Sequence, residues 1–392
     1  LGVTHIWYTG VIRHSTGKPF VKGRPGSPYS ISDYYDVNPY LAEEQDNRLS
    51  EFKKLIKRTH SSGFKLLIDF IPNHVSPDYG DQHGGIPTFD YCDYDWTDTK
   101  KINYSHPDTW GKMYDIVRYW AAMGVDGFRC DMVELVPPEF FAWMIRKIKE
   151  EFPEVIFIAE VYEKHNYWRY IREVGFDYLY DKSGLYDTLM AVYRHGGTAE
   201  AITWNWQFLG DLQPNMLNFL ENHDEVRVAS PEFAQAPEKA YAALACSALL
   251  NDAPFMIYFG QEVGENASDC SNNRTSIFNW KSAKSVNRLI NEIHGEKGLT
   301  RRQQAILTRY QDTLALASEP AFRCGQVHDL GYCSPMDRYR QFAWLRYNDD
   351  SMYLIVANFA EEDAVVTVHI PMSGEDVRVK VAACDYIVRK LK

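Results

Sequence analysis

A charged pair ends an apolar run in the segment "DGFRCDMVELV", residues 126–136. Residues two apart on a β-strand face the same side, so we expect Arg129 and Asp131 to lie next to each other. Packing gives no reason to place two full charges where a strand leaves the core, because burying charge is costly. A functional site does give a reason, since a cation beside a carboxylate keeps that carboxylate ionised.

Three other apolar runs end in residues that are common in active sites. These are Asp69, Asn73 and His74 in "DFIPNH", Glu160 in "AE", and His223 and Asp224 in "ENHDE". Each has an ordinary explanation when taken alone, such as a buried salt bridge from Asp69 to Arg129. Because parallel strands bring the residues at their carboxyl ends together, the recurrence at four strand ends indicates one site.

The elements that would position these residues alternate along the chain. Continuous apolar runs, typical of strands buried on both faces, occur at 3–9, 65–71, 125–131, 155–161, 176–180, 216–220 and 254–259. Helical patterns lie between them, clearest at 107–122 and 137–152. This alternation predicts an α/β fold with a parallel sheet. A doubly wound nucleotide-binding fold is the alternative, but the first strands are not followed by the Gly-rich phosphate loop that it would need. Seven runs predict a (β/α)₈ barrel whose first strand would precede Leu1.

Two segments depart from the alternation. Residues 75–105 form a long stretch rich in Gly, Pro, Asp and Tyr, which predicts a functional loop or a small inserted subdomain. From about residue 340, closely spaced short strands follow one another without helices. We therefore predict a catalytic domain over 1–335, with the insertion at about 75–105, and an antiparallel β-sandwich over 336–392.

Composition excludes several classes of protein. The 392 residues carry a net charge of −11 with scattered Lys and Arg, which argues against a nucleic-acid partner. No apolar run reaches the roughly 18–20 residues of a membrane-spanning helix. The seven cysteines form no C-x-x-C pair, so a zinc site is not indicated. The aromatic content of 14% suits either a large core or a groove that stacks on sugars.

The four strand-end blocks "DFIPNH", "GFRCDMVEL", "AEVY" and "FLENHDE" resemble, in order and approximate spacing, the four conserved regions of the α-amylase family, glycoside hydrolase family 13. "GVTHIWYTG" is similar to its second-strand block, although Gly10 stands where proline is usual. "KINY" at 101–104 resembles the block near the end of the family's inserted domain, and "PFMIYFGQE" resembles the last barrel strand. The resemblance covers about residues 1–280.

The resemblance implies a retaining glycosidase that acts on starch-like α-glucans or maltooligosaccharides. Asp131 would be the nucleophile, Glu160 the general acid/base, and Asp224 the carboxylate that stabilises the oxocarbenium-like transition state. Arg129 would keep Asp131 ionised, while the apolar strand before Glu160 favours the protonated acid. A retaining pair places its carboxyl groups about 5–5.5 Å apart.

Further residues acquire expected roles from the same resemblance. His74 and His223 would bind hydroxyls of the sugar being cleaved, Tyr29 would stack on it, and the pair Asp269 and Arg274 would serve the neighbouring sugar. The chemistry needs no cofactor. Asn73 and Asn103 match positions that hold calcium in many members, so a structural calcium is an expectation.

The chain departs from the family where it carries Glu134 and Leu135. Many α-amylases have Lys-His there, contacting the sugar on the leaving side and, through the His carbonyl, calcium. Neopullulanases and cyclomaltodextrin hydrolases typically have Asn-Glu. Acceptor preference is therefore not carried over by the resemblance.

Four functional hypotheses are weighed against the sequence. The first is the α-glucan hydrolase, of α-amylase or neopullulanase type, and the second a transglycosylase with the same chemistry. The third is an inactive sugar-binding homologue, against which the presence of all three acids argues. The fourth is a metal-dependent barrel hydrolase, which would need an H-x-H pair that the chain lacks.

Overall fold

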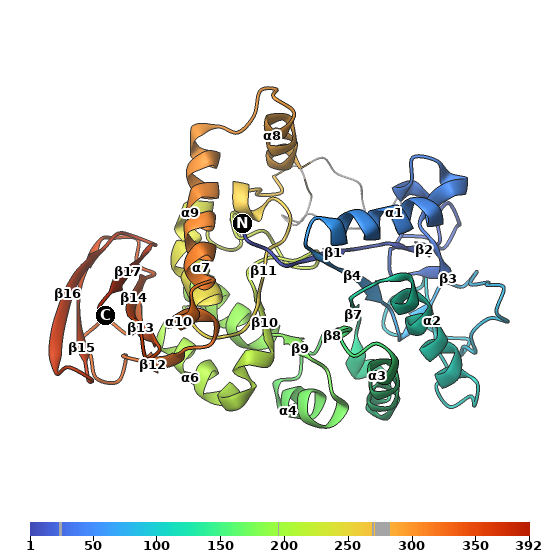
Figure 1. Ribbon diagram of the computed structural model, residues 1–392, viewed down its shortest axis with the longest axis horizontal. Coiled ribbons are helices and arrows are strands. Elements are labelled where there is room, and N and C mark those ends of the chain that lie inside the picture. Colours follow the sequence, from blue (N-terminus) through green and yellow to red (C-terminus); the bar gives the residue numbers. More distant parts are fainter. Residues whose placement is uncertain (23–25, 195, 269, 271–282) are drawn as a thin grey trace. The chain divides into compact units, whose positions relative to one another are not determined.

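The computed structural model describes residues 1–22, 26–194, 196–268, 270 and 283–392 (Figure 1). The chain separates into two compact units. Residues 3–180 form the first, which we call the N-terminal unit. Residues 181–276 and 281–392 make up almost all of the second, the C-terminal unit. The predicted domain boundary between residues 335 and 336 stays a prediction.

The centre of the N-terminal unit is a row of parallel strands in the order β1-β4-β7-β8-β9. Their bounds are β1 His5–Tyr8, β4 Lys65–Phe70, β7 Gly127–Cys130, β8 Ile156–Ala159 and β9 Tyr178–Tyr180. All of β7 and nearly all of β4 and β8 are buried. This burial explains why these strands read as continuous apolar runs in the sequence.

Helices connect these strands: α1 Arg48–Ser61, α2 Thr109–Met123, α3 Pro138–Glu151 and the short α4 Tyr167–Arg169. The buried face of α2 includes Met113, Val117 and Trp120, and α2 is capped by Gly124, whose φ of 108° suits glycine. Helix α3 begins with proline at its first position, where no N–H is needed. The helices predicted at 107–122 and 137–152 are thus confirmed.

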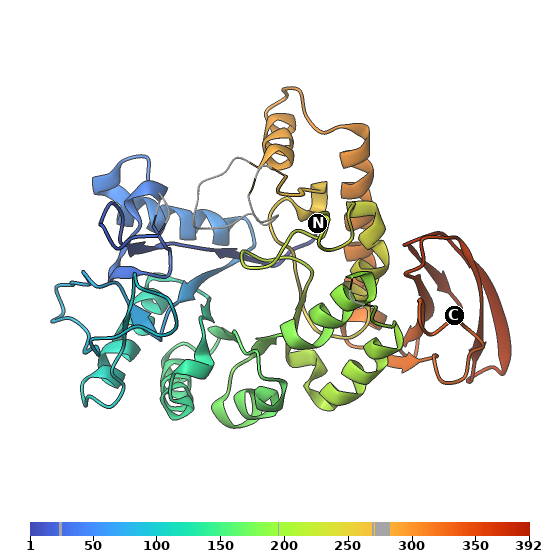
Figure 2. The same cartoon turned by 180° about the vertical axis from the view of Figure 1, so that it is seen from behind.

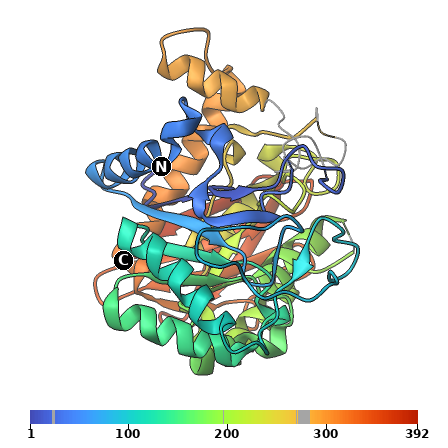
Figure 3. The ribbon, with the colours of Figure 1, turned by 90° about the vertical axis from the view of Figure 1, so that its right-hand side faces the viewer.

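Two small antiparallel sheets complete the N-terminal unit. Strands β2 Ile12–His14 and β3 Ile31–Val37 pair with each other, as do β5 His74–Val75 and β6 Lys100–Lys101. The β5–β6 pair closes the loop of residues 76–99, which lies within the insertion predicted at about 75–105. In Figure 3 this segment lies on the side of the strands away from α1.

The C-terminal unit contains the last two predicted parallel strands, β10 Met216–Phe219 and β11 Phe255–Met256, which pair in parallel. All seven runs predicted as strands therefore contain strands. The eighth strand before Leu1 stays a prediction. The helices of this unit are α5 Asp187–Arg194, α6 Glu200–Leu209, α7 Tyr241–Leu249, α8 Lys284–Ile293, α9 Arg301–Ala317 and α10 Pro320–Arg323.

Two antiparallel sheets face each other at the end of the chain (Figure 2). One has the order β12-β13-β14-β17 and the other pairs β15 with β16. Their bounds are β12 Gln326–Asp329, β13 Gln341–Tyr347, β14 Met352–Asn358, β15 Ala364–Ile370, β16 Glu375–Val381 and β17 Tyr386–Lys390. Alternate side chains of both sheets share one buried core, including Leu345, Val356 and Val368. The first strand of this sandwich begins at Gln326, ten residues before the predicted boundary.

Among the residues described, none belongs to a helix with the length and apolar character that a membrane crossing requires.

Gly127 starts β7 and fixes how closely β4, β7 and β8 approach. A Cβ at this position would lie 2.6 Å from Ile156 Cγ1 and 2.9 Å from the Ile156 carbonyl oxygen. We expect Gly127→Ala to lower the free energy of unfolding by roughly 1–3 kcal/mol, because a packed sheet must shift to admit the methyl group.

Gly111→Ala is the matched control, because Gly111 is exposed on α2 and an added Cβ would meet nothing within 4 Å. It should raise stability by up to about 1 kcal/mol, since alanine favours helix. Denaturant unfolding of both variants provides the measurement. Equal effects would contradict the role assigned to Gly127.

Candidate active site

The parallel register brings Asp131 and Glu160 next to each other. Cys130 is paired with Ala159, and each acid follows directly after its strand. The ladder continues past the strand ends, because Asp131 N–H donates to the Phe70 carbonyl at 2.9 Å and Glu160 N–H donates to the Cys130 carbonyl at 3.1 Å. The two acids, which were predicted from separate strand ends, therefore follow adjacent strands whose backbones are hydrogen-bonded to each other.

Arg129 holds these two acids together. Its Nη1 donates to Asp131 Oδ1 at 2.6 Å, and its Nη2 lies 2.7 Å from Glu160 Oε1 in an ion-pair contact without hydrogen-bond geometry. Asp69 Oδ1 lies 3.7 Å from Nη1. Register explains this third contact, since Asp69 and Arg129 are paired residues of β4 and β7. The arginine is fully buried, and the three carboxylates are at most 6% exposed.

Aromatic rings enclose the same guanidinium. Its carbon lies 5.8 Å from the ring centre of Trp7, 5.5 Å from that of Tyr29 and 5.6 Å from that of Tyr180. Such cation–π contacts are favourable when the cation has lost its water. Burial alone would lower the pKa of Arg129, but the nearby carboxylates, Glu160 foremost, raise it well above its usual value. Arg129 is therefore a permanent cation at the centre of this cluster.

Hydrogen bonds join the segment that follows Asp131 to Glu160 and the segment that follows it. Met132 has a left-handed φ of 43°, rare for a residue with a side chain, and its N–H donates to Glu160 Oε2 at 2.9 Å. The hydroxyl of Tyr162 donates to Glu160 Oε1 at 2.9 Å. Glu134 accepts from Tyr162 N–H at 2.9 Å and from Asn166 Nδ2 at 2.7 Å. Both oxygens of Glu160 thus accept hydrogen bonds from neighbouring residues.

Tyr162 was not predicted as a site residue, although it follows Glu160 by two positions in "AEVY" and the alternation of a strand would have pointed to it. Cys130 lies between the two charged members of the pair and is fully buried. Burial raises the pKa of its thiol, so Cys130 is a packing residue of β7.

Tyr29 and His74 also lie in the N-terminal unit. The Tyr29 hydroxyl donates to Asp69 Oδ1 at 3.4 Å, and the ring is only half-buried, which leaves surface for a ligand. His74 is 4% exposed, with its ring centre 5.3 Å from that of Trp96. Burial lowers the pKa of His74 to about 4, against the opposing charge of Asp93. His74 is therefore neutral near pH 7.

The C-terminal unit holds the third predicted acid. Asp224 Oδ2 lies 2.9 Å from His223 Nε2, with the histidine 1% exposed and the Asp224 side chain 33% exposed. Asn222 shapes this turn, since its Oδ1 accepts from the N–H groups of Asp224 and Glu225, both at 2.8 Å. Asp224 therefore has a fixed backbone and a partly exposed carboxylate.

A buried ion pair supports the same turn. Glu221 Oε2 lies 2.7 Å from Arg227 Nη1, both side chains are fully buried, and Glu221 Oε1 accepts from Val228 N–H at 2.7 Å. Burial raises the pKa of Glu221 even though Arg227 opposes the rise. Asp269 and Arg274, predicted for a neighbouring sugar, lie outside the described residues.

A model of the family described as "Alpha amylase, catalytic domain" matches residues 1–110 and 91–298 of the chain. The chain belongs to the α-amylase family. The α-amylase MalA of Haloarcula japonica is 26% identical over 96% of this chain, and Neopullulanase 2 of Thermoactinomyces vulgaris is 22% identical over 95%. The chain spans 53% and 62% of the lengths of these relatives.

A maltogenic α-amylase of Thermotoga neapolitana has a similar solved structure. It aligns with a TM-score of 0.71 and 22% identity, over 100% of this chain and 88% of that one. The likeness extends to the fold. The resemblance stated from the sequence motifs is thus confirmed at the level of the family.

The departure of this α-amylase-family chain at Glu134 has a structural explanation. The Glu134 carboxylate accepts hydrogen bonds from the backbone and side chain of the segment after Glu160. A lysine here could not accept them. The glutamate thus joins the loops that follow the two acids.

The residues expected to hold calcium do not fit that role. The side-chain oxygen of Asn73 lies 2.5 Å from Lys101 Nζ, and that of Asn103 accepts from Ser105 N–H at 3.0 Å. A cation at Asn73 would meet the lysine ammonium at close range. No group of three or more His, Cys, Asp or Glu side chains suited to a metal occurs among the residues that the structure describes.

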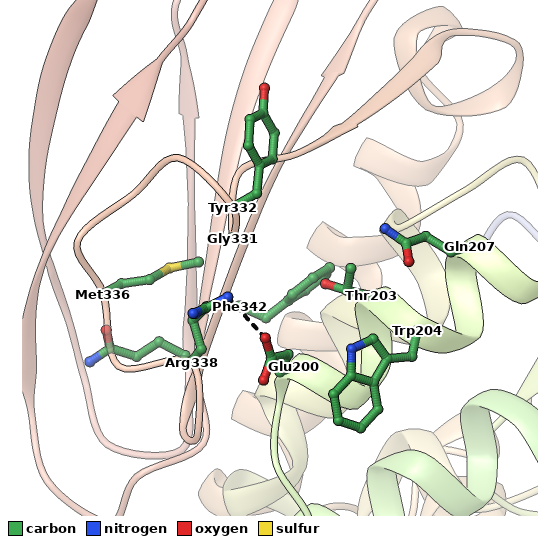
Figure 4. A pocket seen from close by; sticks show the side chains of 10 residues that line it. Glu200, Thr203, Trp204, Gln207, Gly331, Tyr332, Met336, Arg338 and Phe342 are labelled. Carbon is green, nitrogen blue, oxygen red and sulfur yellow. Dashed lines mark hydrogen bonds and ion pairs between the residues drawn. The ribbon is translucent and has the colours of Figure 1, made fainter.

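A separate pocket of about 190 Å³ lies in the C-terminal unit between α6 and the loop that joins β12 to β13 (Figure 4). The exposed rings of Trp204 and Tyr332 line it, together with the ion pair of Arg338 Nη1 and Glu200 Oε1 at 2.9 Å. None of the predicted site residues lines this pocket.

Replacing Arg129 should be among the most harmful single changes in the chain. Arg129→Met keeps most of the volume but leaves buried carboxylates without their cation, so we expect a loss of roughly 3–5 kcal/mol in unfolding free energy. Denaturant unfolding is the measurement.

Arg118→Met is the matched control, because Arg118 forms an exposed pair with Glu151. Its effect should be much smaller than that of Arg129→Met, because an exposed ion pair contributes little to stability. If the two substitutions destabilise the chain equally, Arg129 is not the organising cation.

His74 should make the folded chain sensitive to acid. Between pH 6.5 and 4 the unfolded chain binds a proton at this position while the folded chain, with a pKa of about 4, does not. Stability is therefore retained above pH 6.5 and lost as the pH falls, by about 2 kcal/mol between pH 7.5 and 5. His74→Gln should flatten the stability curve over this range by that amount. Urea unfolding at pH 7.5 and at pH 5 provides the measurement. If His74→Gln loses as much unfolding free energy between these two pH values as the unsubstituted chain does, the assignment is wrong.

Proposed function

We propose that the protein containing this chain is a retaining glycoside hydrolase that cleaves α-1,4-glucosidic bonds of starch-like α-glucans or maltooligosaccharides. The observation that carries the proposal is the cluster in which Asp131 and Glu160 both contact the buried guanidinium of Arg129. Membership of the α-amylase family and similarity to an α-amylase and a neopullulanase support the substrate class.

In the first step Asp131 attacks the anomeric carbon. The bond to the leaving oxygen breaks, and Glu160 donates its proton to that oxygen. Arg129 suits Asp131 to this task because it favours the ionised carboxylate and holds one of its oxygens in place.

In the second step Glu160 accepts a proton from water as the water oxygen attacks the anomeric carbon of the glycosyl–Asp131 ester. The ester bond breaks, Asp131 leaves as a carboxylate, and the sugar keeps its α configuration. The hydroxyl of Tyr162 and the N–H of Met132 each donate to one oxygen of Glu160 and would orient its carboxyl group for these proton transfers. Asp224 would stabilise the positive charge that develops on the sugar ring, and His74, His223 and Tyr29 would bind the same sugar.

A neopullulanase type of activity is the second candidate, supported by the similarity to Neopullulanase 2 over 95% of this chain. The chemistry is the same, so the two candidates differ in which linkages and chain lengths the acceptor side admits. Transfer to a second sugar instead of water is an alternative outcome of the second step. Digestion of soluble starch, pullulan and maltoheptaose, with products resolved by size, separates these candidates.

The full-length protein containing this chain is the object of the decisive test. Asp131→Asn should abolish release of maltooligosaccharides, because an amide is a poor nucleophile. Glu160→Gln should lower turnover of maltooligosaccharides by roughly 10²–10⁴-fold, yet keep the first step fast on α-maltosyl fluoride, whose leaving group needs no proton. Asp115→Asn, the same chemical change at an exposed carboxylate of α2, is the control and should leave activity unchanged.

The anomeric configuration of the first products, followed by NMR, tests retention. Products that begin as the β-anomer would overturn the double displacement. Sugar binding without turnover by the unsubstituted protein on all three glucans would favour the inactive sugar-binding homologue.

A further inference from the structure

The ammonium group of Lys101 lies among three oxygen atoms from three separate segments of the chain. Its Nζ is 2.5 Å from Asn73 Oδ1, 2.9 Å from Asp93 Oδ2 and 2.9 Å from the carbonyl oxygen of Leu135. Asn73 follows β4, Asp93 belongs to the inserted segment, and Leu135 lies four residues after Asp131. A single positive charge thus touches all three segments.

The contacts match the chemistry of a lysine. An ammonium group has three N–H donors and no acceptor, and each donor here has one oxygen. The side chain of Lys101 is 14% exposed and that of Asp93 is 21% exposed, so the pair is largely screened from water. Asp93 also accepts from Asn73 Nδ2 at 2.8 Å. Burial on its own raises the pKa of Asp93, yet the hydrogen bonds of Asn73 and Lys101 bring it below its usual value.

The same contacts are poorly suited to calcium. Calcium takes about six to eight oxygen ligands at roughly 2.3–2.6 Å and usually more than one carboxylate. This set contributes one carboxylate, one amide and one carbonyl, and the lysine already lies within bonding distance of all three. The single carboxylate of Asp93 neutralises the single positive charge of Lys101, whereas a calcium ion carries two positive charges.

We propose that Lys101 does the work of a structural divalent cation in this chain, so that the inserted segment is fastened to β4 and to the segment behind Asp131 without calcium. The side chain comes from β6, which pairs with β5 at the base of the insertion. The internal cation is therefore part of the polypeptide and forms with the fold. This proposal does not depend on the proposed glycosidase activity.

The first test follows thermal unfolding of the unsubstituted full-length protein, because it reports on the fold whether or not the enzyme is active. After treatment with millimolar EDTA and removal of the chelator, the Tm should be the same in buffer with EDTA and in buffer with calcium chloride, at matched ionic strength. A Tm that falls with EDTA and is restored by calcium would overturn the proposal.

The second test empties the position. Lys101→Ala should lower the Tm by roughly 5 °C or more, since it leaves Asp93 without its cation. Lys100→Ala is the matched control, because the neighbouring Lys100 pairs with Asp90, whose side chain is 97% exposed. The control should lower the Tm by less than about 2 °C. Equal losses in the two variants would overturn the proposal.

The third measurement adds calcium chloride to both variants. With the ammonium removed, the three oxygens should bind calcium weakly, so millimolar calcium should raise the Tm of Lys101→Ala more than that of Lys100→Ala. An identical response would show that these oxygens are not a cation site and would overturn the replacement. If Lys101→Ala does not fold, Lys101→Met, which keeps the aliphatic stem, takes its place in both comparisons.

Discussion

The buried guanidinium of Arg129 is the interaction on which the N-terminal unit depends. A fully buried cation is costly unless charge and hydrogen bonds compensate for its lost water. Here the compensation comes from Asp131, Glu160 and Asp69 together, with aromatic faces closing the remaining sides. Neither the acids nor the arginine would be stable in this position alone. The arrangement that the proposed chemistry requires is thus also the arrangement that makes the strand ends stable.

Register turns this electrostatic requirement into a defined geometry. The pairing of Asp69 with Arg129 and of Cys130 with Ala159 determines which side chains meet above the sheet. Backbone hydrogen bonds carry the ladder one residue further, to Asp131 and Glu160. Gly127 belongs to the same constraint, because any side chain there would push β8 away. A shift of one residue in either strand would turn the acids toward the opposite face.

Much of this was predictable from the sequence, and the reasons differ between residues. Asp131 and Glu160 could be found because each ends an apolar run, and the strands were predictable because burial on both faces leaves a continuous apolar pattern. Tyr162 could have been found from strand alternation, because it follows Glu160 by two residues. Glu134 was harder to predict, since its role arises from hydrogen bonds between two loops that are distant in sequence. The role of Lys101 could not be predicted, because a lysine side chain is ordinarily solvated. Its role appears only when Asn73, Asp93 and Leu135 are seen around it.

Cys130 stands between Arg129 and Asp131 in the sequence, so its side chain points to the opposite face of β7. The thiol has no exposed surface, and burial raises its pKa. A protonated, buried thiol does not react with alkylating reagents while the strand stays in its sheet. Its rate of labelling would therefore measure how often β7 detaches from its neighbours, a quantity set by local opening and not by global unfolding alone. The native Cys130 thiol thus reports on local opening of the sheet at β7 without an engineered probe.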